Sequence, residues 1–268
     1  MALIGQPNVA FCLLEGRPLH NVTTTMSDKV SQVLEQTDGL GASTLAFAPV
    51  GQFQWEAVLE GFYDTGAGLA QEGLELTGDQ VLMYALAGNA IGDPFTGIDG
   101  PHGEITTLME RGKFHRTRAN FKAHLGPQGG AHDIILPAAL PVRSYVQAPY
   151  ATVTDVGPTN LATLDWGAGF VDQETGSAIG FLGVSALVLD GGADILFTIQ
   201  DSNNDIAYVD LIVFTAVAAA AAGERVAAAA AAIPGDIERY TQLMYEFRGG
   251  AGALRSCTFA VGLVRSFQ

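Results

Sequence analysis

The stretch QFQWEAVLEGFYD, residues 52–64, decides the fold that we expect for this chain. Apolar and polar residues alternate along it, with Phe53, Trp55, Ala57 and Leu59 on one side and Gln54, Glu56 and Glu60 on the other. This period of two predicts a β-strand with one buried face. A strand of about ten residues spans roughly 33 Å, so we expect it to cross a large sheet.

The segments next to this strand predict one or two short helices and further strands. Residues 28–36 have apolar positions at helix-like spacing, and a short helix or an irregular lead-in both fit. Residues 69–76 are consistent with one or two helical turns, whereas residues 79–87 form an apolar run that suits a fully buried strand. Residues 88–103 contain five glycines and two prolines, which predicts a long exposed loop.

A second alternating strand, residues 115–125, holds five of the seven basic residues of residues 1–140 when Arg111 and Lys113 just before it are included. Arg116, Arg118 and Lys122 occupy its polar side. We interpret these three residues as a candidate subunit interface, in which the basic row meets acidic residues of a neighbouring copy. A solvated strand face is an alternative of about equal weight, and phosphate binding comes third.

The order of elements over residues 28–140 resembles the tail tube proteins of long-tailed bacteriophages. The resemblance rests on the strand WEAVLEGFYD, a small-residue helical segment, a second strand, the glycine-rich loop GNAIGDPFTG and the basic alternating strand. It implies a structural virion protein of the viral tail, assembled in the host cytoplasm. Its subunits would stack as homohexameric rings around a conduit for DNA ejection, with the tape measure and tail terminator or tip proteins as partners.

In that family the inner wall is a sheet of long strands, so the resemblance makes Glu56 and Glu60 candidate lumen-facing residues. Carboxylates repeated around a ring would repel DNA and let it pass without specific binding. The alternative is that both glutamates face solvent outside, or pair with the basic strand of the same subunit.

The amino-acid composition changes between residues 137 and 150, where prolines are frequent, and this change predicts a domain boundary. Residues 1–140 would form a tail-tube-type β-sandwich or barrel. Residues 145–268 predict a second antiparallel β-sandwich that projects outward and decorates the particle. This half resembles sandwich domains appended to phage tail and head proteins. The alternative function is therefore a phage capsid decoration protein or a carbohydrate- or receptor-binding sandwich.

Two apolar features of the sequence could be mistaken for membrane or export signals. Residues 206–222 are nearly long enough to span a bilayer, but Asp210 at their middle costs about 3 kcal/mol. A buried strand followed by an alanine-rich segment explains them better, and we expect residues 218–222 and 227–232 to be a loop and a strand, with a short helix as the alternative. The N-terminus lacks a basic region, so we do not expect a signal peptide.

No catalytic, metal or cofactor motif is visible in the sequence. The net charge of −15 argues against a surface that binds nucleic acid. The two cysteines, Cys12 and Cys257, indicate neither a disulfide framework nor a cysteine-based metal site. Residues 201–205 resemble the beginning of an EF-hand calcium-binding loop, but the residues after them do not match the rest of that loop. We therefore expect a hairpin turn there. The histidines form no zinc-binding pair. We therefore expect no enzyme activity and no cofactor.

Overall fold

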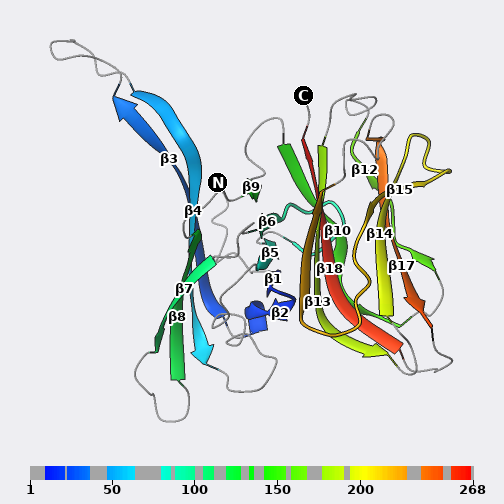
Figure 1. Ribbon diagram of the computed structural model, residues 1–268, viewed down its shortest axis with the longest axis horizontal. Helices are drawn as coiled ribbons and strands as arrows, with labels where there is room; N and C mark the ends of the chain where they lie inside the picture. Colours follow the sequence, from blue (N-terminus) through cyan, green and yellow to red (C-terminus); the bar gives the residue numbers. More distant parts are fainter. Residues whose placement is uncertain are drawn as a thin grey trace, which may run out of the picture.

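The computed structural model describes residues 10–21, 23–36, 47–63, 80–85, 88–99, 105–111, 119–127, 133–135, 142–154, 158–167, 177–189, 194–227, 237–249 and 255–266. Within these residues the chain forms four antiparallel sheets, and the one helical element is the three-residue 3-10 turn η1 (Leu19–Asn21) (Figure 1). The prediction of an all-β protein is therefore confirmed.

The longest strands form one four-stranded sheet in the order β3-β4-β8-β7, at the left of Figure 1. Its strands are β3 (Thr23–Gln36), β4 (Phe47–Tyr63), β8 (Ala119–Pro127) and β7 (Ile105–Arg111). The predicted strand at residues 52–64 is confirmed, and β4 begins five residues earlier than expected. The prediction of a helix or lead-in at residues 28–36 is wrong, because these residues pair along β4 from Ala57 to Phe47. Cross-strand pairing outweighs the weak helical spacing.

A second sheet, β2-β1-β5-β6-β9, comes from the N-terminal half as well. Its strands are β1 (Phe11–Leu14), β2 (Arg17–Pro18), β5 (Val81–Ala85), β6 (Thr96–Asp99) and β9 (Asp133–Ile135). The strand β5 is buried along its whole length, as its apolar run predicts. The long exposed loop predicted at residues 88–103 is wrong, because it contains β6 and because Phe95 and Ile98 are buried.

The C-terminal half forms two sheets packed face to face, as the sandwich prediction requires. One sheet has the order β10-β18-β13-β16, and the other has the order β11-β17-β14-β15 with β12 also paired to β17. Their bounds are β10 (Val142–Val153), β11 (Thr159–Asn160), β12 (Leu164–Asp165), β13 (Ser177–Leu189), β14 (Asp194–Ser202), β15 (Val209–Val213), β16 (Ala222–Ala227), β17 (Tyr240–Arg248) and β18 (Arg255–Ser266). A core of large apolar side chains joins the two sheets, and Phe197, Tyr245 and Phe259 lie at its centre.

The β10-β18-β13-β16 sheet is covered on its other face by strands of the N-terminal half. A second core cluster joins Phe11, Met83 and Phe95 to Phe181 and Val264. Residues before β6 also pair with the edge of β10. The Gly92 amide donates to the Val146 carbonyl at 2.9 Å, the Val146 amide donates to the Asp93 carbonyl at 2.8 Å, and Pro94 forms an antiparallel bridge with Tyr145. The division into residues 1–140 and 145–268 stays a prediction, and β10 requires any boundary to lie before Val142.

The alanine-rich region is part strand and part exposed turn. Residues 218–220 are exposed, and β16 contains Ala222 and Ala227 at its ends. The rest of the second alanine run lies outside the described residues, as does the helical segment predicted at residues 69–76. Among the residues that the structure describes, no helix is long and apolar enough to cross a membrane.

Candidate functional site

The long-stranded sheet has two faces of different character. Along β4, Leu59 and Gly61 are buried whereas Glu60 is exposed and Val58 is half-buried. Because side chains alternate along a strand, Glu56 lies on the same face as Glu60. The alternation read from the sequence is therefore confirmed at the residues whose burial is described.

The strand register places acidic and basic residues opposite one another on the Glu60 face. Lys29 of β3 is the cross-strand partner of Glu56. Lys122 of β8 is the partner of Glu60 on one side and of Glu110 in β7 on the other. Opposite charges directly across an antiparallel pair stabilise it by roughly 0.2–1 kcal/mol. The register thus supports the alternative that the glutamates pair with basic residues of the same subunit.

The structure brings together some of the predicted site residues and not others. Glu56, Glu60 and Lys122 lie on one face of one sheet, with Lys122 in the strand β8 between β4 and β7. Arg116 and Arg118 lie outside the described residues. Their role at a subunit interface, and the lumen-facing role of Glu56 and Glu60, stay predictions.

The two cysteines are buried free thiols rather than reactive groups. Burial raises the pKa of Cys12 and of Cys257 to about 12 each, so both stay protonated near neutral pH. The main-chain amide of Cys12 donates to Nδ1 of His20, 3.2 Å away, and burial lowers the pKa of that histidine. Within the described part of the chain no group of three metal-ligating side chains is present.

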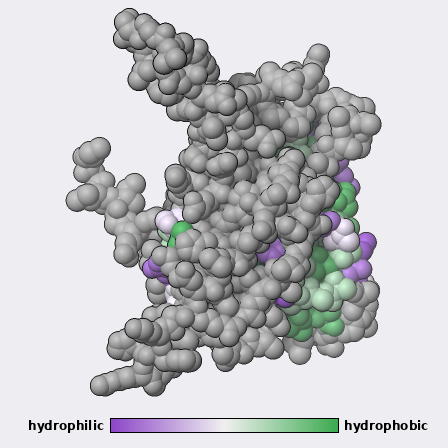
Figure 2. Space-filling view, turned by 60° about the vertical axis from the view of Figure 1, so that its left-hand side comes forward, coloured by the Kyte–Doolittle hydropathy of each residue, from purple (hydrophilic) through white to green (hydrophobic). Residues whose placement is uncertain are grey.

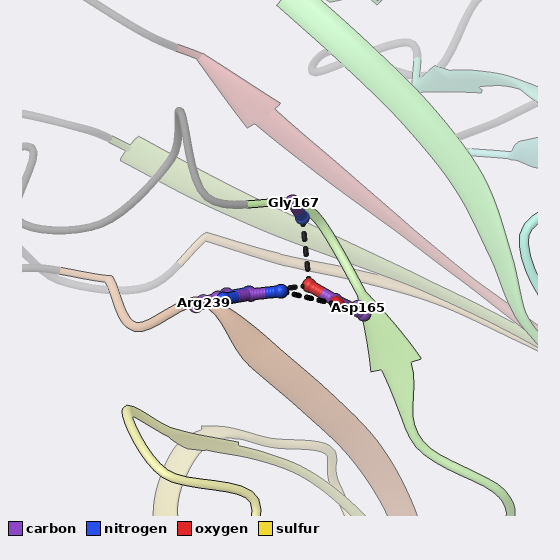
Figure 3. A network of polar contacts seen from close by, with 3 residues as sticks. All are labelled: Asp165, Gly167 and Arg239. Atoms are coloured by element: carbon purple, nitrogen blue, oxygen red, sulfur yellow. Dashed lines mark hydrogen bonds and ion pairs between the residues drawn. The ribbon is translucent and has the colours of Figure 1, made fainter.

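A polar cluster that the sequence analysis did not identify lies at one end of the sandwich (Figure 3). Asp165 accepts two hydrogen bonds from Arg239, from Nε at 2.7 Å and from the terminal nitrogen at 2.6 Å. The Gly167 amide donates to the same carboxylate at 2.8 Å. The hydrogen bond from Arg239, and to a lesser extent that from the Gly167 amide, lowers the pKa of Asp165. The pair is 74 residues apart in sequence, so no local spacing could have indicated it.

The hairpin between β14 and β15 lies beside this cluster and is fixed by its own side chains. Asn204 Oδ1 accepts hydrogen bonds from the amides of Ile206 and Ala207, and Asp205 has a positive φ of 59°. The Tyr208 hydroxyl donates to Asp205 and lies 2.9 Å from Thr163 Oγ1. The prediction of a hairpin turn at residues 201–205 is confirmed, since β14 and β15 pair antiparallel on either side of it.

Comparisons with known proteins give weak similarities. No family model and no curated protein matches the chain. Among solved structures, it is similar to the Dit protein of SPP1, described as a paradigm of the hub adsorption apparatus in phages that infect Gram-positive bacteria, with 9% identity and a TM-score of 0.30 over 95% of this chain and 98% of that chain. It is also similar to a structure of the infectious bursal disease virus Gx strain (15% identity, TM-score 0.26, 91% of this chain and 51% of that chain). The VP2 subviral particle of the same virus gives 12% identity and a TM-score of 0.25 over 92% and 57% of the two chains. TM-scores of this size do not establish a shared fold.

Proposed function

We propose that this chain is a structural protein of a bacteriophage tail, and more specifically a tail tube subunit that forms stacked homo-oligomeric rings around a DNA conduit. The observation that carries the proposal is the β3-β4-β8-β7 sheet, in which a 17-residue strand pairs with a 14-residue strand on one side and a 9-residue strand on the other. An extended sheet with one polar face is the element that such a tube needs for its inner wall. The sandwich would then project outward.

In this proposal the polar face of β4, with Glu56 and Glu60, lines the lumen. The register adds Lys29, Lys122 and Glu110 to the same face. The register positions on this face thus hold three acidic and two basic residues, so each subunit contributes one net negative charge at these positions. Repeated around a ring, these positions form a weakly acidic wall, because basic residues neutralise most of the acidic ones. Such a wall repels the phosphates of DNA mildly and offers no continuous basic track to which they could bind.

In the same proposal, Arg116, Arg118 and Lys122 contribute to contacts between subunits. A heterologous interface between identical subunits closes into a ring when the rotation closes. Complementary charges across such an interface fix its register more than they add affinity. The net charge of −15 makes acidic partners for the basic strand abundant on a neighbouring copy.

Electron microscopy of the purified full-length protein tests the proposal. A tube subunit forms rings or hollow filaments, whereas a capsid decoration or receptor-binding protein stays small. The double variant Arg116→Glu, Arg118→Glu should prevent assembly while the circular dichroism spectrum stays that of the wild type. As a control, Arg239→Glu with Arg248→Glu changes the net charge equally, at exposed positions of the sandwich, and should assemble normally. Assembly of the first variant, or loss of assembly in the control alone, rejects the interface.

A further inference from the structure

The outer face of the β11-β17-β14-β15 sheet carries a row of hydrogen-bonded polar side chains. Since Leu243, Tyr245 and Phe247 of β17 point into the core, the alternate residues Tyr240 and Gln242 lie on the outer face. Gln242 Nε2 donates to Gln200 Oε1 at 3.1 Å, and Gln200 Nε2 donates to Asp210 Oδ1 at 2.7 Å. The three side chains form a ladder across β17, β14 and β15.

Two tyrosines lie at the end of this ladder. Tyr240 is the cross-strand partner of Ser202 in β14 and of Asp165 in β12. The guanidinium of Arg239, which Asp165 holds, lies 4.8 Å from the centre of the Tyr240 ring. This stacking fixes the orientation of the ring and covers one of its sides.

Tyr208 reaches the same end of the sheet from the other side. It directly precedes β15, yet its hydroxyl lies 2.9 Å from Thr163 Oγ1, which directly precedes β12. Because β17 and β14 lie between β12 and β15 in the sheet, the Tyr208 side chain extends over their ends. Burial first, then the hydrogen bond to Asp205, raise the pKa of Tyr208.

We propose that this tyrosine–amide face, defined by Tyr208, Tyr240, Gln242, Gln200 and Asp210, binds a neutral oligosaccharide. The C–H groups on one side of a sugar ring pack against the flat side of an aromatic ring, and a tyrosine held in place loses little entropy on binding. Sugar hydroxyls both donate and accept hydrogen bonds, and so do the amides of glutamine. A small number of fixed polar groups beside aromatic side chains is the usual composition of a ligand site.

The polar groups divide into those that touch the ligand and one that supports them. Gln242 has 6% of its surface exposed, so it positions Gln200 rather than contacting the sugar. Gln200 is half-buried and Asp210 is exposed, which leaves both within reach. Three neighbouring strands span about 10 Å, a width that suits an oligosaccharide better than a single sugar.

The same sheet edge also offers apolar surface to the ligand. Val213 in β15, the cross-strand partner of Thr198 on the same face as Gln200, has an exposed fraction of 50%. Figure 2 shows hydrophobic residues beside hydrophilic ones on the right-hand side of the molecule. Apolar Val213 beside polar Gln200 and Asp210 gives the outer face a mixed surface, which fits sugars because they present both hydroxyls and C–H groups.

Charge decides which class of glycan is bound. The Asp165 and Arg239 charges compensate each other, whereas Asp210 of the ladder and Asp205 beside Tyr208 add negative charge. The chain as a whole has a net charge of −15. An anionic glycan or a polymer rich in phosphate is therefore repelled, and the guanidinium described beside this face, Arg239, is already held by Asp165. A neutral glycan meets neither obstacle.

The test is binding of the full-length protein to an array of neutral and anionic oligosaccharides, followed by isothermal titration calorimetry with the best neutral ligand on the array. We expect binding to neutral oligosaccharides, and an affinity about tenfold lower in Tyr240→Ala, the loss of one stacking contact. Gln200→Ala should weaken binding as well, and it keeps the test valid if the tyrosine variant does not fold. Thr152→Ala, an exposed position in β10 of the other sheet, should bind like the wild type.

Three results would overturn the proposal: no binding to any neutral oligosaccharide, a preference for anionic glycans, or unchanged affinity in both Tyr240→Ala and Gln200→Ala. The result is independent of ring assembly, which electron microscopy reports. Glycan binding without rings rejects the tube and keeps this site, and rings without glycan binding do the reverse.

Discussion

The two faces of the β10-β18-β13-β16 sheet are packed in different ways. Towards the β14 and β17 strands the sheet presents large side chains such as Leu182, Phe259 and Leu263, which fill the sandwich core. Towards the β1, β5 and β6 strands it presents Gly183, Ala260 and Gly262, and large side chains of the N-terminal half occupy the space above them. The second core therefore combines side chains of this sheet, such as Phe181 and Val264, with large side chains of the N-terminal half that lie over Gly183 and Gly262.

Glycine makes the second kind of packing possible. A Cβ atom on Gly262 would lie 2.2 Å from the Phe95 ring, and one on Gly97 would lie 2.7 Å from the Phe181 ring. Phe181 and Gly262 are also cross-strand partners, so each phenylalanine lies over a glycine of the opposing sheet, and the two rings pack edge to face with centroids 6.0 Å apart. Close approach of two sheets is a recognised reason for glycine in a strand interior.

The largest effect is expected at the β1–β2 turn, which touches the glycine-rich face. Gly16 has a φ of +71°, and a Cβ there would lie 2.2 Å from the Val184 carbonyl and 2.6 Å from the Ala222 carbonyl. Gly16→Ala combines backbone strain with a clash against main-chain atoms, so we expect a loss of about 3 kcal/mol or more in the free energy of unfolding. Urea denaturation measures it. A loss below about 1 kcal/mol would mean that the turn does not pack on this sheet.

A smaller effect is expected from Gly262→Ala, because the obstacle is a side chain that can move. Overpacking costs roughly 1–3 kcal/mol. Adding Phe95→Leu should restore part of that stability, since the smaller side chain makes room for the new methyl group. Chemical denaturation of both single variants and the double variant gives the coupling energy. If the losses in the free energy of unfolding of the two single variants simply add up in the double variant, the contact between these two residues is contradicted.

A pH effect is expected on the same side of the sheet. Burial lowers the pKa of His20, whose ring packs edge-on against Tyr150 with centroids 4.9 Å apart. A histidine with a lowered folded-state pKa contributes stability that is present above its unfolded pKa of about 6.5 and is lost as the pH falls. The melting temperature should fall between pH 7 and pH 5, and less so in His20→Gln. Identical pH dependence in both proteins would show that His20 is not the group responsible.

The smallest effect is expected at the exposed ion pair of Arg239 and Asp165. Exposed pairs contribute little to stability because water and salt screen them. Arg239→Ala should therefore leave the melting temperature almost unchanged, while Tyr240 loses the group stacked on its ring. Differential scanning calorimetry tests this. A marked loss of stability would mean that the pair is part of the structural core of the sandwich.

The sequence predicted those features that depend on local alternation. Residues 52–63 alternate strictly enough to reveal the strand β4 and its faces, and the C-terminal strands likewise predict a sandwich. The strand β3 was missed because its polar sequence, TTTMSDKVSQVLEQ, forms a strand through pairing with β4, a partner that lies beyond a connection of ten residues. Gly97 and the loop before it were read as irregular because glycine signals a turn unless the opposing side chain is known.

The same distinction applies to the candidate sites. Glu56 and Glu60 could be assigned to one face from spacing alone, but their basic neighbours Lys29 and Lys122 follow from the register of three strands. The tyrosine–amide face joins side chains from three strands and from the residue before β15, up to 42 residues apart, as for Gln200 and Gln242 on β14 and β17. No local motif encodes such an arrangement.

The most direct test of the proposed function is a reconstruction by cryo-electron microscopy of the assembled full-length protein. We expect stacked rings in which β4 lines the inner wall, Glu56 and Glu60 face the axis, and the sandwich lies on the outside. A protein that remains monomeric at every concentration tested would contradict the account, and so would a ring in which the Glu60 face of the β3-β4-β8-β7 sheet is turned away from the lumen.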